Sequence, residues 1–380
     1  MKRILFVANV TKEHILKFHV PSIKAFKDSG WEVDVASSGS EPVPYCDHQY
    51  AMCWKRSPFT VKTLKGILEL RKLINRNGYD VVYCHTPVGG VVGRLASGKA
   101  RKNGTKVIYF AHGFHFFKGA RFVNWALYFP IEKLLSLLTD AIFVSNGEDF
   151  RRVQRSFPKK LYTKQFPEVG VDYKRIAVPD PIKVRGEYRD ALGFAPDDIV
   201  LVYVAELIEN KNQIYLLRVL KALVNTRKNI RLLLVGPDHA NGYYQREARK
   251  MGIEQYVVFT GWRDDIGALL CASDICVASS IREGFGINIV EAMYHHLPIV
   301  AVRNRGHEAI IQNGSNGILV SLEDCEQMER AVLRVIEDDA LRAHLSDCDV
   351  SRFDADTVAK TIVREVEMVI ETPKSPKASK

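Results

Sequence analysis

Two glutamates, Glu283 and Glu291, stand eight positions apart in the stretch SIREGFGINIVEAM, on either side of two glycines. Such carboxylates could form an acid–base pair, could accept hydrogen bonds from the hydroxyls of a sugar and a ribose, or could belong to the solvated edge of an ordinary helix. Gly284 and Gly286 permit close approach of the backbone, and amides at the start of the helix that follows could receive a phosphate. Spacing alone leaves the three interpretations open.

Histidines and glycines in the first half form a second set of candidates. His112 closes the apolar run in YFAHGFHFF, and His115 follows it. The turn HTPVGG places Thr86, Gly89 and Gly90 at the start of a predicted helix, where they could contact a phosphate or the hydroxyls of an acceptor. The alternative is structural: a histidine at a strand end can be a satisfied buried group, and glycines in such a turn can serve tight packing.

Three other patterns do not predict a site. The stretch RDDI lacks a D-x-D arrangement, and Asp264 is expected to cap the next helix. The stretch PDP at 179–181 is expected in an interdomain loop. The neighbours Cys84 and His85 lack companions at a spacing that would hold a metal ion.

Apolar strands alternate with helical segments, such as 61–76, along the chain that carries these residues. Residues 28–31 are expected to end a helix just before the next strand. The pattern restarts after a loop at 178–184. The predicted strands are 3–9, 32–38, 81–86, 106–112, 141–146, 199–206, 231–236, 256–261, 275–280 and 298–302. This alternation predicts an α/β protein with two Rossmann-like domains, whose parallel sheets face each other across a cleft. Ligands of such sheets bind beyond the carboxyl ends of the strands.

The predicted domains are 1–175, which would bind an acceptor, and 176–353, which would bind a nucleotide. The domains would close on each other about a hinge near 172–184. Residues 354–371 form an amphipathic helix that we expect to pack back on the first domain, and residues 372–380 are expected to be disordered.

The composition is that of a globular protein in the cytoplasm. The chain has 380 residues, of which 47% are hydrophobic and 26% charged, and no uncharged apolar run of about 18 residues predicts a membrane span. The apolar part of the first ten residues is too short for a signal peptide and is better interpreted as a strand. The seven cysteines show no C-x-x-C spacing, so we expect reduced thiols.

Positive charge is concentrated in the first half. Residues 1–175 hold 29 Lys+Arg and 14 Asp+Glu, a net charge of +15, whereas the rest of the chain has a net charge of −5. The asymmetry could reflect solubilising lysines, nucleic acid, anionic lipid headgroups or a phosphorylated lipid-linked acceptor. No helix-turn-helix, RRM or zinc-finger pattern accompanies the charge, so we expect no nucleic acid partner. We expect a peripheral protein on the inner face of the cell membrane.

The stretch REGFGINIVEAM resembles the E-x7-E signature of glycosyltransferase family 4, whose members are retaining enzymes of the two-domain GT-B fold. Four further segments of the second half follow in the order and spacing of that family: 202–213, 232–238, 258–266 and 304–320. In the first half, three segments resemble the branch that makes bacterial capsule and exopolysaccharide: 83–96, 109–120 and 124–150. The resemblance spans nearly the whole chain.

The resemblance implies a role for each candidate. Glu291 would accept hydrogen bonds from the ribose hydroxyls, and Glu283 would hold the donor sugar near its anomeric carbon. Lys211 would neutralise the leaving diphosphate, and His112 would lie near the donor sugar. The other implied nucleotide-sugar contacts are Glu206, Gly236, Trp262, Arg263, Gly284 and the amides of Phe285, Gly286 and Ile287.

One residue departs from the family pattern. Many members carry an arginine where this chain has Glu206, and a glutamate cannot neutralise a diphosphate. The resemblance therefore leaves open which cation assists Lys211. Arg282, Arg303 and Arg305 are available for that task.

The implied reaction is hexosyl or N-acetylhexosaminyl transfer from a nucleotide diphosphate sugar, expected to be a UDP-sugar, to a hydroxyl of a polyprenyl-diphosphate-linked or other glycan acceptor. It implies no cofactor and no metal ion, because cations and helix dipoles stabilise the leaving diphosphate. Two alternatives remain: a UDP-sugar epimerase of the same fold, or a basic nucleic-acid-binding protein. A NAD-dependent dehydrogenase is disfavoured, because FVANVTKEH lacks the G-x-G-x-x-G turn.

Overall fold

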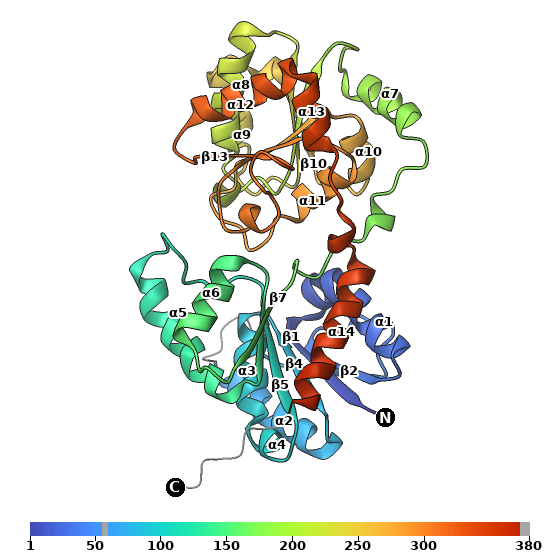
Figure 1. The fold of residues 1–380 in the computed structure, drawn as a ribbon, viewed down its shortest axis with the longest axis vertical. Coiled ribbons are helices and arrows are strands. Elements are labelled where there is room, and N and C mark those ends of the chain that lie inside the picture. Colours follow the sequence, from blue (N-terminus) through green and yellow to red (C-terminus); the bar gives the residue numbers. More distant parts are fainter. Residues whose placement is uncertain (55–59, 373–380) are drawn as a thin grey trace. The chain divides into compact units, whose positions relative to one another are not determined.

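The computed structural model describes residues 1–54 and 60–372. The chain divides into two compact units: the first comprises residues 1–170 and 355–380, and the second comprises residues 171–354 (Figure 1). The chain therefore passes between the units twice. Of the predicted disordered tail, residues 373–380 lie outside the described residues.

The first unit contains a seven-stranded parallel sheet. Its strands, in spatial order, are β3 (His48–Ala51), β2 (Glu32–Ser38), β1 (Arg3–Val10), β4 (Val81–His85), β5 (Lys106–Ala111), β6 (Ala141–Val144) and β7 (Tyr162–Gln165). The order runs outward in both directions from the neighbours β1 and β4. A topological switch point, where ligands of open α/β sheets bind, therefore lies between these two strands.

Helices cover both faces of this sheet. They are η1 (Thr11–His19), α1 (Val20–Asp28), α2 (Val61–Asn77), α3 (Pro87–Ala96), α4 (Gly98–Lys102), α5 (Phe122–Leu135), η2 (Ser136–Leu138), α6 (Gly147–Ser156) and α14 (Ala355–Glu371). Alternate residues of β1 point to opposite faces: Ile4 and Phe6 join the core under α1 and α14, whereas Leu5 and Val7 join the core under α2 and α3. Helix α14, drawn in red in Figure 1, lies along α1.

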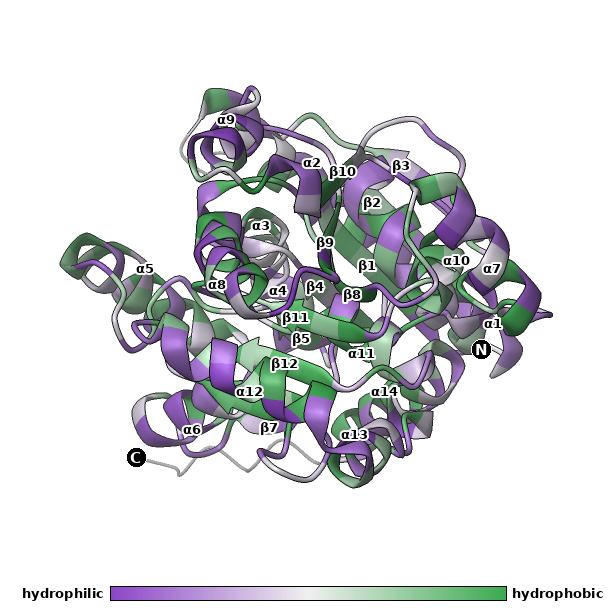
Figure 2. Cartoon of the chain, turned by 90° about the horizontal axis from the view of Figure 1, so that it is seen from above, coloured by the Kyte–Doolittle hydropathy of each residue, from purple (hydrophilic) through white to green (hydrophobic). Residues whose placement is uncertain are grey.

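The second unit contains a six-stranded parallel sheet. Its spatial order is β10 (Val257–Gly261), β9 (Ile230–Val235), β8 (Ile199–Val204), β11 (Ile275–Ala278), β12 (Ile299–Val302) and β13 (Ile318–Val320). The order again reverses, here between β8 and β11. Strands β11 and β12 are coloured hydrophobic and the outer helix α9 largely hydrophilic in Figure 2, as expected for a sheet buried on both faces.

The helices of the second unit connect these strands. They are η3 (Tyr173–Arg175), α7 (Pro181–Leu192), η4 (Glu209–Lys211), α8 (Gln213–Thr226), α9 (Tyr243–Lys250), η5 (Glu254–Tyr256), α10 (Ile266–Cys271), α11 (Ile287–Tyr294), η6 (His307–Ala309), α12 (Cys325–Glu337), α13 (Asp339–Ser346) and η7 (Ser351–Phe353). The predicted α/β class with two parallel sheets is confirmed.

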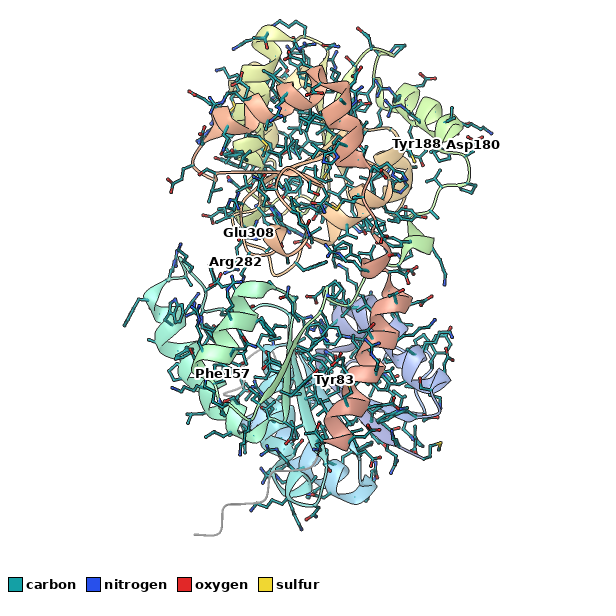
Figure 3. All side chains as sticks on the ribbon, in the orientation of Figure 1. Tyr83, Phe157, Asp180, Tyr188, Arg282 and Glu308 are labelled. Carbon is teal, nitrogen blue, oxygen red and sulfur yellow. The ribbon has the colours of Figure 1, made fainter. Side chains whose placement is uncertain are left out.

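Two local predictions are wrong. The segment 178–184 is not all loop, because α7 begins at Pro181 and the side chain of Asp180, labelled in Figure 3, caps it by accepting a hydrogen bond from the Lys183 amide. Asp264 does not cap α10: the residue before this helix is Asp265, whose carboxylate instead binds Arg263 and the hydroxyl of Tyr188.

All seven cysteines are free thiols. Within residues 1–54 and 60–372, no helix combines the length and apolar character that crossing a membrane requires.

Candidate functional site

Lys211 and Glu283 lie at the carboxyl edge of the second sheet, where its strand order reverses. Lys211 ends η4 in the connection after β8, and Glu283 lies in the loop after β11, which pairs with β8. The fold thereby brings together two residues that are 72 positions apart in the chain. This is the position at which open α/β sheets bind ligands.

The carboxylate of Glu283 is held from two sides. Its Oε1 atom forms an ion pair with the Lys211 ammonium and accepts a hydrogen bond from Ser280 Oγ at 2.6 Å. Ser280 Oγ in turn lies 2.6 Å from the hydroxyl of Tyr203. Burial raises the pKa of Tyr203, and the nearby Glu283 carboxylate adds to the effect, so the phenol keeps its proton. The protein therefore fixes this carboxylate before any ligand binds.

The backbone of Lys211 is fixed to the same strand ends. Its carbonyl accepts hydrogen bonds from Ser279 Oγ at 2.8 Å and from the Tyr203 hydroxyl at 3.3 Å. The next residue, Asn212, has a φ of 55°, and this left-handed conformation turns the chain from η4 into α8. The ammonium is thus carried by an anchored turn.

The loop after β12 packs against the loop that carries Glu283. Asn304 Nδ2 donates to the Ser280 carbonyl at 2.9 Å, and Arg305 Nε donates to the Glu283 carbonyl at 3.3 Å. A Cβ atom on Gly306 would lie 2.5 Å from the Cβ atom of Glu283, so this close approach requires glycine. Among the three arginines that could take the place of the family arginine, Arg305 therefore reaches the Glu283 loop from the neighbouring loop.

The other two candidate cations lie in the same group of loops. Arg303 pairs with Glu308 at 2.9 Å, and Arg282 is exposed beside Glu283 in the chain. Figure 3 labels Arg282 and Glu308 among these loops. The side chain of Glu206 is exposed and forms no ion pair within the described part of the chain.

Helix α11 follows the Glu283 loop directly. Phe285 and Gly286 are buried, and Gly286, the residue before the helix, supplies no capping side chain. Glu291 lies in the second turn and is half-buried. Burial raises the pKa of the Cys276 thiol on β11 to about 12, and the Glu291 carboxylate adds to the effect, so Glu291 lies near this thiol.

The remaining candidates of the second unit follow neighbouring strands. Gly236 follows β9 with a φ of 153°, and a Cβ atom there would lie 2.1 Å from the Ala205 carbonyl oxygen. Trp262 follows β10 and is 70% exposed. The guanidinium of Arg263 is committed to Asp265, with Nε at 2.7 Å from Oδ1. Gly236 is thus required by its backbone conformation and by its close approach to Ala205. The side chain of Trp262 is accessible to solvent.

A hollow of about 510 Å³ elsewhere in this unit does not belong to the candidate site. Its lining includes Ile199, Ile275 and Pro298, which lie where β8, β11 and β12 begin. It is therefore at the amino edge of the sheet, opposite the edge that carries the ion pair.

In the first unit, the turn before α3 is satisfied by its own contacts. Thr86 Oγ accepts hydrogen bonds from the amides of Gly89 and Asn9, both at 3.2 Å, and the Gly90 amide donates to the Thr86 carbonyl at 2.8 Å. A Cβ atom on Gly89 would lie 2.9 Å from Ala8 Cα, and one on Gly90 would clash with a tyrosine ring. These contacts support the packing interpretation of the two glycines.

His112 follows β5, as the sequence predicts. Its Nδ1–H donates to the Glu168 carboxylate, its ring stacks on Phe110 with centroids 4.6 Å apart, and its Nε2 has no hydrogen-bond partner among the described residues. His115 stacks on Tyr128, with centroids 4.7 Å apart. The predicted contact of His112 with a donor sugar stays a prediction.

Three other histidines surround His112. Their ring centroids lie 5.1 Å (His14), 5.6 Å (His19) and 5.7 Å (His85) from that of His112. Burial lowers the pKa of His14 to about 2 and the pKa values of His19 and His85 well below the ordinary value, and the neighbouring histidines add to the effect. The rings of His14, His19 and His85 are therefore neutral at physiological pH.

These companions of His85 were not predicted from the sequence. They were missed because residues 14, 19, 85 and 112 become neighbours only through the strand order β1–β4–β5. The available signal was their position: each lies at or shortly after the end of one of these strands. Ser280, Tyr203, Asn304 and Gly306 were missed for the same reason, because their roles arise from contacts between loops.

Both units of the chain match models of glycosyltransferase families. The family model described as "Glycosyl transferases group 1" matches residues 184–348, and the one described as "Glycosyl transferase 4-like" matches residues 3–146. EpsD of Bacillus subtilis (strain 168), which is named as a glycosyltransferase, is 42% identical to this chain over 331 residues. These residues cover 87% of this chain and 86% of EpsD.

Two further similarities are more distant. The "UDP-Gal:alpha-D-GlcNAc-diphosphoundecaprenol alpha-1,3-galactosyltransferase" of Escherichia coli is 26% identical over 76% of this chain and 74% of its own. The crystal structure of Anabaena Alr3699/HepE in complex with UDP superposes with a TM-score of 0.79 at 21% identity, covering 97% of this chain and 100% of that chain. The two share a fold.

Proposed function

Because this chain belongs to the glycosyltransferases of group 1, and is a glycosyltransferase of the GT-B fold, we propose that it transfers a hexose or N-acetylhexosamine from a UDP-sugar to a lipid-linked glycan. The acceptor would be a hydroxyl of a polyprenyl-diphosphate-linked sugar in bacterial surface polysaccharide synthesis. The E. coli relative, named for a UDP-Gal donor and a diphosphoundecaprenol acceptor, supports both substrate classes. The observation that carries the proposal is the Lys211–Glu283 pair at the switch point.

In this proposal Lys211 stabilises the leaving diphosphate. Negative charge grows on that group as the anomeric carbon gains oxocarbenium character, so a fixed ammonium lowers the barrier. In the absence of donor, the ammonium is neutralised by Glu283. A bound diphosphate would share the ammonium, while Ser280 continues to hold the carboxylate.

Glu283 and Glu291 would hold the two ends of the donor. A glutamate accepts two hydrogen bonds from neighbouring hydroxyls, so Glu291 suits the ribose and Glu283 suits the sugar. The uncapped start of α11 at Gly286 and Ile287 would receive the distal phosphate. Arg305, which contacts the Glu283 loop, would supply the second cation that Glu206 cannot supply.

Transfer would retain the anomeric configuration by front-face attack, with the leaving phosphate helping to deprotonate the acceptor hydroxyl. This route needs no nucleophile from the enzyme. It also assigns no metal ion to the diphosphate, because Lys211, Arg305 and the α11 amides take that role. Retention is checked by the anomeric configuration of the product.

The first unit would bind an anionic membrane surface from the cytoplasmic side. Its helix α5 exposes the apolar side chains of Phe122 (82%) and Val123 (66%), and Figure 2 colours part of this helix hydrophobic. The exposed Arg121 precedes this helix and the exposed Lys133 lies in its last turn. The first 175 residues carry a net charge of +15. Apolar and cationic groups together favour anionic headgroups. Raising the salt concentration should release the protein from anionic vesicles.

The test is donor binding and turnover in two variants. A panel of nucleotide sugars is first screened for thermal stabilisation, since a ligand stabilises the state that it binds. With the selected donor, Glu291→Ala should raise the donor Kd, and Lys211→Ala should lower kcat about 100-fold. Lys221→Ala, an exposed lysine on α8, is the matched control.

Unchanged donor binding and turnover in both variants would overturn the assignment of the site. Formation of a converted nucleotide sugar in the absence of any acceptor would favour the epimerase alternative.

A further inference from the structure

Four histidines occupy the switch point of the first sheet. His14 and His19 lie on η1 directly after β1, His85 ends β4, and His112 follows β5. The strands β1, β4 and β5 are neighbours, so all three contribute from one edge. Helix η1 is a π-helix, whose i→i+5 hydrogen bonds place residues five apart, such as His14 and His19, on the same face.

The imidazole nitrogens of these residues converge. One nitrogen from each of the four lies within 4.8 Å of those of the other three, and Nε2 of His14 is 3.0 Å from Nε2 of His19. In a tetrahedral zinc site with Zn–N distances of about 2.0–2.1 Å, the ligand nitrogens lie roughly 3.3 Å apart. Small side-chain movements would therefore bring this set to ligand spacing.

Several of these nitrogens are buried and have no partner. His85 is fully buried, and neither its Nδ1 nor its Nε2 forms a hydrogen bond with any residue that the structure describes. The same holds for Nε2 of His112. Buried polar groups in proteins almost always have partners, so the lone pairs of these nitrogens are available to a ligand. A cation that accepts one lone pair from each ring would satisfy Nε2 of His112 and one of the two nitrogens of His85.

Glu168 binds the outer nitrogen of His112. It is buried, has a φ of 54°, and its carboxylate accepts the Nδ1–H of His112, which leaves the lone pair of Nε2 directed to the other side of the ring. Carboxylate–histidine–metal triads use this arrangement to fix the tautomer and orient the ring. The carboxylate also supplies negative charge beside a site of four neutral ligands.

We propose that His14, His19, His85 and His112 bind one divalent transition-metal ion of the zinc class in an all-imidazole site, with Glu168 positioning His112. Imidazole suits Zn²⁺, Cu²⁺, Ni²⁺ and Fe²⁺, and a closed four-ligand tetrahedral site is the structural arrangement of zinc. The ion would tie η1 to the ends of β4 and β5. All of its residues belong to the first unit, and its test does not depend on the proposed glycosyl transfer.

A second cluster, Glu32, Asp34 and His48, does not carry the same inference. The Arg3 guanidinium binds Glu32 at 2.6 Å, and the Tyr79 hydroxyl donates to Asp34 at 2.5 Å. The charge of this cluster is already compensated by a protein cation. The four-histidine cluster has no such cation within the described part of the chain.

The experiment titrates the chelator-treated full-length protein with ZnCl₂ by calorimetry and with CoCl₂ by visible absorption, in the absence of donor. We expect one ion per chain and the absorption of tetrahedral Co²⁺. His85→Phe keeps an aromatic ring but has no nitrogen ligand, and should weaken binding at least about 100-fold. Glu168→Gln should weaken it about 10- to 100-fold. The exposed His344→Phe is the matched control and should bind as the wild type does.

The proposal is overturned if the wild type binds less than one ion per chain. It is also overturned if His85→Phe and Glu168→Gln, each shown to be folded by circular dichroism, bind the ion as tightly as the wild type. If His85→Phe does not fold, Glu168→Gln alone decides, because its side chain keeps the shape of glutamate. All of these readouts are independent of transferase activity, so failure of either proposal leaves the other testable.

Discussion

The position of Glu283 depends on the size of its neighbours as well as on their charge. Ser280 and Lys211 bind its carboxylate, while Gly306 leaves room for its Cβ atom. The acidic side chain is therefore placed by three separate segments, after β8, β11 and β12. Small errors in such placement are costly for catalysis, because a shift of about 1 Å in a reacting group can cost about 100-fold in rate.

Gly306→Ala should lower kcat about 100-fold, because the new methyl group would lie 2.5 Å from the Glu283 Cβ atom and push the carboxylate away from its place. The measurement is steady-state transfer with the donor selected above. Gly186→Ala is the control: a Cβ atom on Gly186, in helix α7, meets nothing within 4 Å. That control should leave kcat unchanged and raise stability by about 0.5–1 kcal/mol. Equal activity of both variants would contradict the proposed importance of this contact.

Ser280→Ala should lower kcat/KM about tenfold, because a hydrogen bond to a charged group contributes about 1.5–3 kcal/mol. The ion pair with Lys211 would remain, so the loss should be smaller than in Gly306→Ala. Ser280→Thr, which keeps the hydroxyl, should restore most of the activity. If threonine and alanine behave alike, the hydroxyl does not position Glu283.

At this scale the sequence suggested the charged residues that the proposed site uses, but not the residues that support them. Lys211, Glu283 and Glu291 follow from the family resemblance. Ser280 and Gly306 belong to common residue types, and their roles depend on which loops meet. From the sequence, three arginines are candidates for the cation that replaces the family arginine at Glu206. The structure favours Arg305, because its side chain donates to the Glu283 carbonyl.

At the scale of elements, helix α7 is attached to the second unit by polar groups. The buried Arg189 binds Asp274 at 3.2 Å, and Tyr188, labelled in Figure 3, donates to Asp265 at 2.7 Å. The first turn of the helix is capped by Asp180. The helix therefore depends on hydrogen bonds and charge as well as on apolar packing.

Because of this attachment, the free energy of unfolding should depend on pH through the carboxylate of Asp265. The hydrogen bonds from Arg263 lower the pKa of Asp265 from 3.8 to about 2. Because the folded-state pKa is the lower one, the contribution is present above about pH 4 and is lost as the pH falls through 2. The Arg263 side chain is 37% exposed, so the contribution is at most about 1 kcal/mol.

Asp265→Asn should therefore lower the melting temperature at pH 6 and have a progressively smaller effect between pH 4 and pH 2. Thermal melting at a series of pH values measures this difference. Asp197→Asn, an exposed aspartate before β8, is the control and should show no such trend. A difference between wild type and Asp265→Asn that is as large at pH 2 as at pH 6 would contradict the role of Arg263.

The strands that the sequence predicted are those with apolar residues on both faces. The strands β3, β7 and β13 were missed, and all three lie at the edges of their sheets. Strands β3 and β7 read HQYA and YTKQ, with little apolar character, because an edge strand is partly solvated. Strand β13 has only three residues, too few to show a period. Edge strands are therefore specified by pairing with their neighbours.

At the scale of the whole molecule, the first unit depends on the end of the chain. Helix α14 contributes five apolar residues to the core on the α1 face of the first sheet: Val358, Ile362, Val363, Val366 and Val369. Burying each contributes about 1.5–3 kcal/mol, so together they contribute on the order of 10 kcal/mol. This is comparable to the total stability of a typical domain, about 5–15 kcal/mol.

Deleting residues 355–380 should therefore unfold the first unit and leave the second unit folded. Tryptophan fluorescence can follow this, because Trp31, Trp54 and Trp125 lie in the first unit and only Trp262 lies in the second. Deleting only residues 373–380 is the control, because α14 ends at Glu371. A shortened chain 1–354 with the fluorescence and melting profile of the full protein would contradict this dependence.

The two crossings of the chain also set an order of events during synthesis. When the ribosome has added Asp354, every residue of the second unit has been made, but the first unit still lacks α14. At about 5–20 residues per second, the sheet face under α14 waits roughly 10–40 s after Gly170 for its cover. The portion of the protein that is made first is thus the last to be completed, and a nascent chain must keep that apolar face from aggregating until translation ends.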